Sequence, residues 1–255
     1  GGYALAKALG HTILKPLPAL VQLRCAGSFW KGLAGVRCDA RIQLLISGRG
    51  TNESYEEQGE LQLTDYGISG IPVFQLSRFA AAALDAGRQV KASIDFLPGF
   101  RDNEALWQEL VEEKCTSCRQ RSMEVLFGGL VNKKIIQTAV KLCGLSMGDR
   151  AERKNLPAIR KVFALLRSFE VQVTDTNPFA NAQVCAGGVP LTEVDGHLES
   201  RICPGLYLAG ELLDADGRCG GYNLQWAWTT GYIAGKDAVL SLGKPAGQRK
   251  KGKRE

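Results

Sequence analysis

The sequence of 255 residues lacks any apolar run of about 18 uncharged residues, the length that a membrane-spanning helix needs. It also lacks an internal period of roughly 20 to 50 residues, which excludes solenoid and propeller repeats, and it shows no secretory leader. Eight cysteines without such a leader are typical of free thiols in a reducing compartment rather than of a disulfide scaffold. We therefore expect a soluble, cytoplasmic, globular protein without a membrane partner.

Positive charge is concentrated near one end of the chain. The formal net charge is +6, but residues 244–255 contain six Lys or Arg and one Glu, so this tail carries +5 and the rest is close to neutral. A basic tail is most often a solvated, mobile end. We do not expect nucleic acid as a partner, and binding of nucleic acid through the tail is kept as an alternative.

The periodicity of apolar residues divides the chain into four segments and the tail. The first is a short helix closed by Gly10 with a proline-rich exit. The second alternates apolar and polar residues, which is typical of short antiparallel strands in a barrel or sandwich, with one embedded helix. The third is helical, and the fourth has α/β character like the first. The predicted boundaries are 1–20, 21–100, 101–168, 169–243 and 244–255.

This order predicts an α/β multidomain fold in which the two ends of the chain form one discontinuous domain interrupted by a β-barrel and a helical insert. Within the helical insert, Asp102 is the expected cap of the helix that follows it, and Asn155 with Pro157 is expected to begin the last helix. Near the C-terminal end, the apolar run 205–210 is the length of a buried parallel strand.

Glycines and carboxylates alternate in GLYLAGELLDADGRCGGYNLQWAW, residues 205–228. A strand that leads through glycines into a helix leaves unpaired backbone N–H groups, whose partial positive charge suits a phosphate or an electron-rich ring. Gly220 and Gly221 remove the Cβ atoms that would keep a ligand away, and Asp214 or Asp216 can accept hydrogen bonds from sugar hydroxyls. The pattern predicts a nucleotide-like ligand, although a glycine-rich turn needed only for tight packing is the alternative.

Three stretches resemble one flavoprotein family. They are GGVPLTEVDGHLESRICPGLYLAGELLDADGRCGGYNLQWAWTTGYIAG (187–235), GGYALAKALGHTI (1–13) and DYGISGIPVFQLS (65–77). The chain is similar to the family that includes aminoacetone oxidase and a bile-acid 4,6-reductase. The resemblance implies an FAD/NAD(P)-binding, Rossmann-like domain in two pieces, with FAD as the cofactor and NAD(P)H left open as the reductant.

The resemblance also implies which residues hold the cofactor. Gly210, Glu211 and Asp214 would line the ribityl and pyrophosphate region. The backbone N–H groups of a second set would approach the isoalloxazine ring: Gly220, Gly221, Tyr222, Asn223, Leu224 and Gln225. A third set would lie near the ring: Ala186, Gly187, Gly188 and Val189. N–H groups beside the ring would stabilise its reduced, anionic form.

One feature of the family is missing. The family begins with a strand, a GxGxxG turn and an acidic residue some 20 residues later, and no GxGxxG occurs in these 255 residues. We expect a fragment of a longer enzyme rather than a decayed copy. As a fragment, the chain should bind FAD weakly or not at all.

Several other residues have a functional and a structural interpretation. Cys115 and Cys118 form a CxxC, but without a second pair at metal spacing no metal site is predicted. His11 is expected to be structural, and His197 lies in a polar turn. The aromatic residues after the glycines could line a flavin site, with Trp228 equally compatible with the core, and Cys219 could present a thiol near the flavin.

The leading functional prediction is an FAD-dependent oxidoreductase that moves a hydride to or from a small organic substrate. Amine oxidation and reduction of an enoyl or steroid-type C=C bond are not separated by the sequence, because the flavin supplies the chemistry and no side chain declares itself as acid or base. Catalytic residues and the oligomeric state therefore stay unassigned. A non-catalytic flavin- or nucleotide-binding remnant is the alternative from another class.

Overall fold

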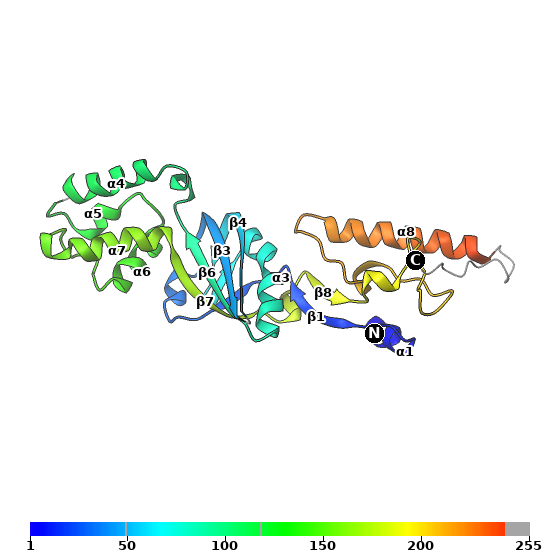
Figure 1. Cartoon of the computed structure of the whole chain (residues 1–255). Coiled ribbons are helices and arrows are strands. Elements are labelled where there is room, and N and C mark those ends of the chain that lie inside the picture. The colour runs from blue at the N-terminus through cyan, green and yellow to red at the C-terminus, as the bar shows by residue number, and fades with distance from the viewer. Residues whose placement is uncertain (49, 118, 243–255) are drawn as a thin grey trace. The chain divides into compact units, whose positions relative to one another are not determined.

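The computed structural model describes residues 1–48, 50–117 and 119–242. Contacts divide the chain into two compact units, one built from residues 1–20 together with the chain from Ala182 onward, and one built from Val21–Asn181 (Figure 1). The basic tail and Cys118 lie outside the described residues. No helix of the described part is long and apolar enough to cross a membrane.

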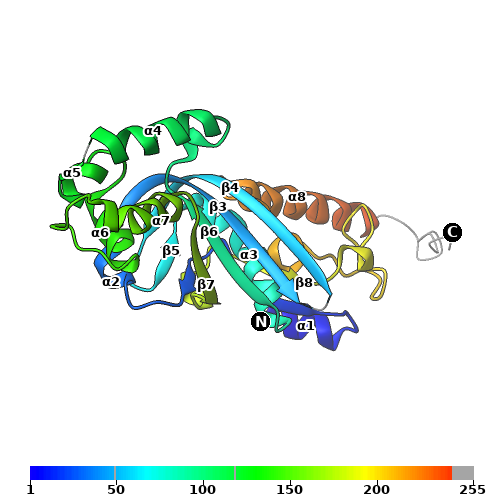
Figure 2. The same ribbon diagram turned by 60° about the vertical axis from the view of Figure 1, so that its left-hand side comes forward.

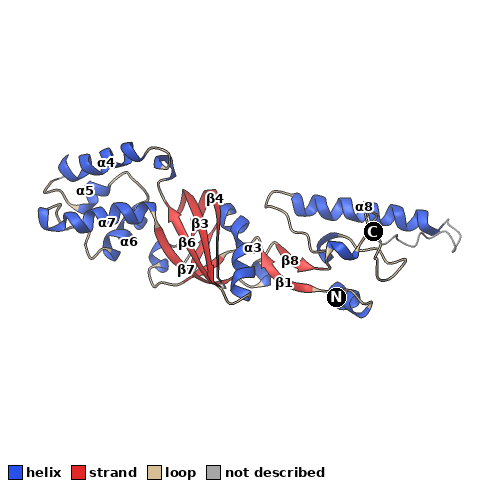
Figure 3. Cartoon of the chain, viewed as in Figure 1, coloured by secondary structure: helices blue, strands red, loops and turns tan. Residues whose placement is uncertain are grey.

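The Val21–Asn181 unit contains a closed six-stranded barrel (Figure 3). The strands follow the order β2-β5-β4-β3-β6-β7. Along β3 every second side chain is buried in the core, as at Ile42, Leu44 and Ile46, because successive residues of a strand face opposite sides of a sheet. The strands are β2 (Leu23–Cys25), β3 (Arg37–Gly48), β4 (Thr51–Leu63), β5 (Gly67–Ser69), β6 (Gln89–Asp95) and β7 (Phe169–Thr176).

The alternation therefore correctly predicted strands, and of the two predicted architectures the barrel is the one formed. The long β3–β4 hairpin pairs over twelve residue positions. β3 also pairs with β6, and β6 pairs with β7 (Figure 2). Two helices belong to this part of the unit, α2 (Trp30–Leu33) and α3 (Ile71–Asp85).

The boundary predicted at residue 169 is wrong. β7 pairs with β2 and β6 and completes the barrel, so residues 169–181 belong to the barrel unit and not to the C-terminal part of the cofactor domain. The alternation in FEVQVTD, residues 169–175, is typical of a strand, and β7 does form there. Its partners lie far away along the chain, and local periodicity does not report them.

The helical insert lies between β6 and β7. It consists of η1 (Pro98–Phe100), α4 (Glu104–Ser117), α5 (Met123–Phe127), α6 (Lys133–Leu142), η2 (Arg153–Asn155) and α7 (Leu156–Arg167). The cap of α4 differs from the prediction, because the side chain of Asn103, not Asp102, accepts a hydrogen bond from the Leu106 N–H at 3.0 Å. Asn155 does precede α7, but its side chain donates to the Arg150 carbonyl instead of capping the helix.

The remaining unit is thin and open. Its elements are α1 (Gly2–Ala8), β1 (Leu14–Ala19), β8 (Val184–Gly188), η4 (Leu191–Glu193), η5 (Gly210–Leu212) and α8 (Tyr222–Leu242), while η3 (Phe179–Asn181) closes the barrel unit. β1 and β8 form a two-stranded antiparallel sheet. β1 includes the proline-rich stretch that was predicted to follow the first helix. Pro16 and Pro18 are compatible with this strand because a sheet edge has positions that need no N–H donor.

The strand predicted at 205–210 does not form. Leu208 is buried, but its N–H donates to the Leu198 carbonyl, and the Ser200 N–H donates to the Leu206 carbonyl. The segment makes a single antiparallel bridge between Glu199 and Tyr207 rather than a ladder. The run is therefore only partly buried, and it packs against a turn instead of lying within a parallel sheet.

Candidate functional site

A cavity of about 400 Å³ opens within the thin unit, at the N-terminal end of α8. The glycine-rich loop before α8 forms one wall, and the end of β1, the start of β8 and η5 form the others. The lining residues are Leu20, Gln183, Val184, Glu211, Ala215, Cys219, Gly220, Gly221, Asn223, Leu224, Trp226 and Ala227. All of them belong to the same compact unit.

The loop requires glycine at two positions. Gly220 has a φ of +121° and Gly221 a φ of +95°, a region that residues with a Cβ rarely adopt. Space is open around both, since a Cβ on Gly221 would meet nothing within 4 Å and one on Gly220 would meet only a ring carbon of Tyr222 at 4.0 Å. These glycines therefore allow the backbone to turn with positive φ, and their lack of a side chain leaves the cavity open at this wall.

The side chain of Asn223 ties the loop to the helix. Its Oδ1 accepts a hydrogen bond from the Gly217 N–H at 2.8 Å, and its Nδ2 donates to the Gly217 carbonyl at 3.0 Å. Both polar groups of Gly217 are thus held by the first turn of α8. The loop is preorganised at the positive end of a 21-residue helix.

Gly210 is held to α8 by two side chains. Its N–H donates to Thr230 Oγ1 at 2.9 Å, and its carbonyl accepts from Trp226 Nε1 at 3.1 Å. Thr230 is buried, and Trp226 lines the cavity. The indole ring therefore positions η5 while contributing an apolar wall.

The two predicted carboxylates brace the neighbouring strand. Glu211 accepts a hydrogen bond from the Cys185 N–H, and Asp214 Oδ1 accepts one from the Gly187 N–H at 3.1 Å. Burial, reinforced by the charge of Glu211, raises the pKa of the Cys185 thiol, so this cysteine stays protonated and is no nucleophile near neutral pH. The carboxylates thus stabilise the peptide units of β8, a role that the motif did not predict.

The paired glycines of β8 serve chain packing. A Cβ on Gly187 would lie 2.6 Å from the Lys15 carbonyl oxygen, and one on Gly188 would lie 2.6 Å from the Leu212 carbonyl oxygen. Such distances are too short for real side chains. The pair therefore lets β8 approach β1 and η5 closely, and Val189 beyond it is fully buried.

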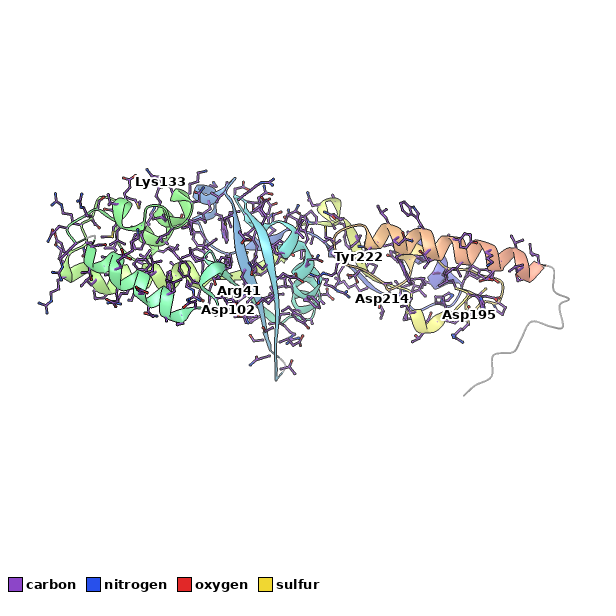
Figure 4. All side chains as sticks on the ribbon, turned by 90° about the horizontal axis from the view of Figure 1, so that it is seen from above. Arg41, Asp102, Lys133, Asp195, Asp214 and Tyr222 are labelled. Carbon is purple, nitrogen blue, oxygen red and sulfur yellow. The ribbon has the colours of Figure 1, made fainter. Side chains whose placement is uncertain are left out.

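The predicted cofactor residues fall into two groups. Glu211, Gly220, Gly221, Asn223 and Leu224 line the cavity, whereas the others hold its walls or lie beside it: Ala186, Gly187, Gly188, Val189, Gly210, Asp214, Tyr222 and Gln225. Figure 4 labels Asp214 and Tyr222. The sequence interpretation missed further lining residues, namely Leu20, Gln183, Val184, Ala215 and Ala227.

The other residues singled out in the sequence have ordinary roles or none assigned. His11 is buried, with Nδ1 2.7 Å from Glu193 Oε2 and Nε2 2.9 Å from Ser200 Oγ, in keeping with a structural histidine. Trp228 is 67% exposed, so it does not belong to the core of the described part. Among the residues that the structure describes, no group of three or more His, Cys, Asp or Glu side chains could hold a metal ion.

Comparison with known proteins agrees with this architecture. The unit formed by the two ends of the chain has mixed α and β elements, and its cavity lies at the glycine-lined N-terminus of α8. The family model described as "HI0933-like protein Rossmann domain" matches residues 1–237. The chain belongs to this family, which confirms both the predicted flavoprotein resemblance and the Rossmann-like fold class.

Relatives with curated names cover nearly all of the chain. The chain is 42% identical over 239 residues to the 3-dehydro-bile acid delta(4,6)-reductase of Clostridium scindens. The matched region covers 93% of this chain and 57% of that protein. The chain is 27% identical over 234 residues (91% and 54%) to the ribosomal RNA dihydrouridine synthase of Haemophilus influenzae, and 26% identical over 241 residues (94% and 56%) to that of Escherichia coli. The chain thus spans a little over half the length of each.

Proposed function

We propose that the chain is part of an FAD-dependent reductase that saturates a carbon–carbon double bond conjugated to a carbonyl group. The observation that carries this proposal is the cavity at the N-terminus of α8, in a chain 42% identical to a named reductase. Reduction is preferred to amine oxidation because the names of all three relatives denote saturation of a double bond. We further propose NAD(P)H as the reductant and a cytoplasmic location.

The residues present fit a flavin. The open loop at Gly220 and Gly221 leaves room for a planar ring beside backbone N–H groups, and Leu224 and Trp226 offer apolar surface. Glu211 keeps lone pairs beyond the one used by Cys185, so it can also accept from a hydroxyl group. When bound, the flavin supplies the hydride, and the polypeptide orients it and excludes water.

One face of α8 supports the proposal that the cofactor domain is larger than the described unit. Five large apolar side chains lie 61–79% exposed along one side of the helix: Leu224, Trp228, Tyr232, Val239 and Leu242. Gly231 and Gly235 lie on the same side, and a Cβ on either would meet nothing within 4 Å. Because glycine inside a helix costs about 0.5–1 kcal/mol relative to alanine, this pattern favours close packing against further polypeptide.

We propose that the dinucleotide-binding segment that the sequence lacks covers this face and completes the site. The support is the greater length of the relatives and the small core of the unit, whose buried apolar cluster contains only seven residues of the described part. A second copy of the chain on this face, or a decayed copy that binds nothing, would contradict the proposal.

The test is a flavin titration of the purified chain, followed by absorbance in the visible flavin bands. We expect little binding by the chain alone and recovery of a yellow complex when the unmatched segment of the Clostridium scindens reductase is added. Gly221→Val, which forces a side chain into a positive-φ position at the cavity wall, should abolish that recovery. Gly148→Ala, at a site without close neighbours, is the matched control.

Turnover then separates an enzyme from a binding remnant. A complex that oxidises NAD(P)H in the presence of a conjugated enone supports the reductase. A yellow complex that never passes electrons to any enone or uridine acceptor would favour the non-catalytic alternative, and a complex that oxidises amines would overturn the proposed direction.

RNA is a second candidate substrate. Two relatives are named as ribosomal RNA dihydrouridine synthases, and the uracil ring contains a double bond conjugated to a carbonyl, so the same hydride transfer serves it. The specific observation that favours RNA is the charge of the helical insert. The near-neutral total charge of the body conceals this uneven distribution.

A further inference from the structure

The helical insert carries a large excess of positive charge. Residues 101–168 contain thirteen Lys or Arg and eight Asp or Glu, a net charge of +5. Residues 1–100 and 169–242 together contain thirteen Lys or Arg and seventeen Asp or Glu, a net charge of −4. The near-neutral charge of residues 1–242 is therefore the sum of a basic insert and an acidic remainder of the sequence.

Two paired backbone segments of the insert carry arginines. Residues 119–124 run antiparallel to residues 147–151, with a bridge between Ser122 and Arg150. The Ala151 N–H donates to the Arg121 carbonyl at 2.8 Å, and the Asn155 side chain donates to the Arg150 carbonyl at 2.9 Å. These bonds fix the backbone positions from which the arginines project.

Three arginines of these segments and one at the start of η2 form what we call the arginine strip: Arg119, Arg121, Arg150 and Arg153. All four side chains are exposed, and none makes an ion pair with a described residue. Five of the other nine cations of the insert are neutralised by carboxylates, among them Lys133 by Glu124, Arg160 by Glu112 and Arg167 by Glu104.

The acidic residues nearest the strip in sequence are already engaged. Glu152 pairs with Lys154 at 2.9 Å. Asp149 accepts a hydrogen bond from the Ser146 N–H, and this bond holds the pKa of its carboxyl below the usual value. The strip therefore presents guanidinium groups without a matching set of free carboxylates.

We propose that the arginine strip binds the phosphodiester backbone of a folded RNA. This inference rests on the RNA branch of the proposed function and adds the surface that binds the substrate. A guanidinium group presents a planar fork of donors that matches two phosphate oxygens and stays charged at any physiological pH. An RNA stem that lies along the paired segments would bring its phosphates within reach of these exposed guanidinium groups.

The experiment compares two triple variants of the whole chain. Arg121→Gln, Arg150→Gln and Arg153→Gln together remove three charges from the strip. The probe is a labelled RNA stem–loop, titrated at several salt concentrations and followed by fluorescence anisotropy. We expect the variant to bind at least about tenfold more weakly at low salt and to lower the salt slope by about 2 to 3, since each phosphate contact contributes about 0.9.

The control triple removes the same charge elsewhere. Lys7→Gln, Lys141→Gln and Lys236→Gln change exposed lysines outside the strip, and residues 243–255 are identical in both variants, so any contribution of the tail cancels. We expect RNA affinity within about twofold of the unchanged chain. Equal losses in the two triples would show a general charge effect and overturn the assignment.

Two further titrations test the class of partner. A DNA hairpin of the same sequence and vesicles of phosphatidylcholine with phosphatidylserine replace the RNA. Weaker binding of both than of the RNA supports the proposal, and a strip-dependent affinity as high for either one would overturn it. Flavin titration of the strip variant with the complementing segment should be unchanged, which separates failure of the strip from failure of the flavin site.

Discussion

Thr230 is the residue through which α8 holds the edge of the cavity. Its hydroxyl oxygen accepts from the Gly210 N–H at 2.9 Å, and the hydroxyl donates to the Trp226 carbonyl at 2.6 Å, while the residue is only 2% exposed. Thr230→Val keeps the shape of the side chain but removes the acceptor. An N–H group left without a partner costs about 1–3 kcal/mol, and because Gly210 is only partly buried we expect about 1–2 kcal/mol.

Thr230→Ser is the matched variant because it keeps the hydroxyl group. It loses one buried methyl group, a cost of about 0.8 kcal/mol from the transfer of apolar surface, but it leaves the Gly210 N–H paired. Since Glu211 follows Gly210 and lines the cavity, the valine variant should also weaken flavin binding more than the serine variant does.

Amide hydrogen exchange of the 205–213 peptide measures this effect directly. A loss of 1–2 kcal/mol in local stability corresponds to an exchange rate about 5 to 30 times faster. The valine variant should show this change at Gly210, and the serine variant a smaller one of at most about fourfold, from the lost methyl group. Equal exchange in the two variants, or unchanged protection with valine, would refute the role assigned to the hydroxyl group.

Three further predictions concern other parts of the chain. Gly70→Ala places a Cβ 2.3 Å from a β4 carbonyl oxygen at a φ of +105° and should cost at least about 2 kcal/mol in urea unfolding, against about 0.5 for Gly99→Ala; similar costs would contradict this. Burial raises the pKa of Cys25 to about 12 and that of Cys38 to about 11. Iodoacetamide should therefore leave both thiols unmodified at about pH 8, and their early labelling in mass spectra would contradict this. Although partial burial opposes it, hydrogen bonds from neighbouring donors lower the pKa of Glu193. The stability that this shift provides is full above the unfolded value of 4.5 and is lost as the pH falls through the lowered pKa. In Glu193→Gln the free energy of unfolding should therefore fall less steeply with pH below about pH 4.5, and an unchanged pH dependence would contradict this role.

Local patterns predicted much of the barrel and helical parts. The alternation in β3 and β6 and the three- and four-residue spacing in α6 appear in the structure as strands and a helix, because burial of one face follows directly from side-chain period. The apolar run at 205–210 misled because a buried strand and a buried turn segment have the same composition. Its partner at 198–200 is what distinguishes them.

The candidate site divides in a similar way. The glycines at 220 and 221 were predictable, since positive φ values leave few alternatives to glycine. The roles of Glu211 and Asp214 were not, because a carboxylate beside a glycine loop can accept from a ligand hydroxyl or from a backbone N–H. Only the position of β8 shows that backbone groups of Cys185 and Gly187 take these bonds.

By itself, the sequence determined the family, the α/β class with its two inserts, and the glycine positions where the chain must turn with positive φ. These depend on residue type and on neighbours a few positions away. The tertiary structure alone decided that β7 closes the barrel, that Thr230 and Trp226 hold Gly210, and that the segments carrying Arg121 and Arg150 are paired. Each of these requires contacts between residues far apart in sequence, whose positions are fixed only when the whole chain folds.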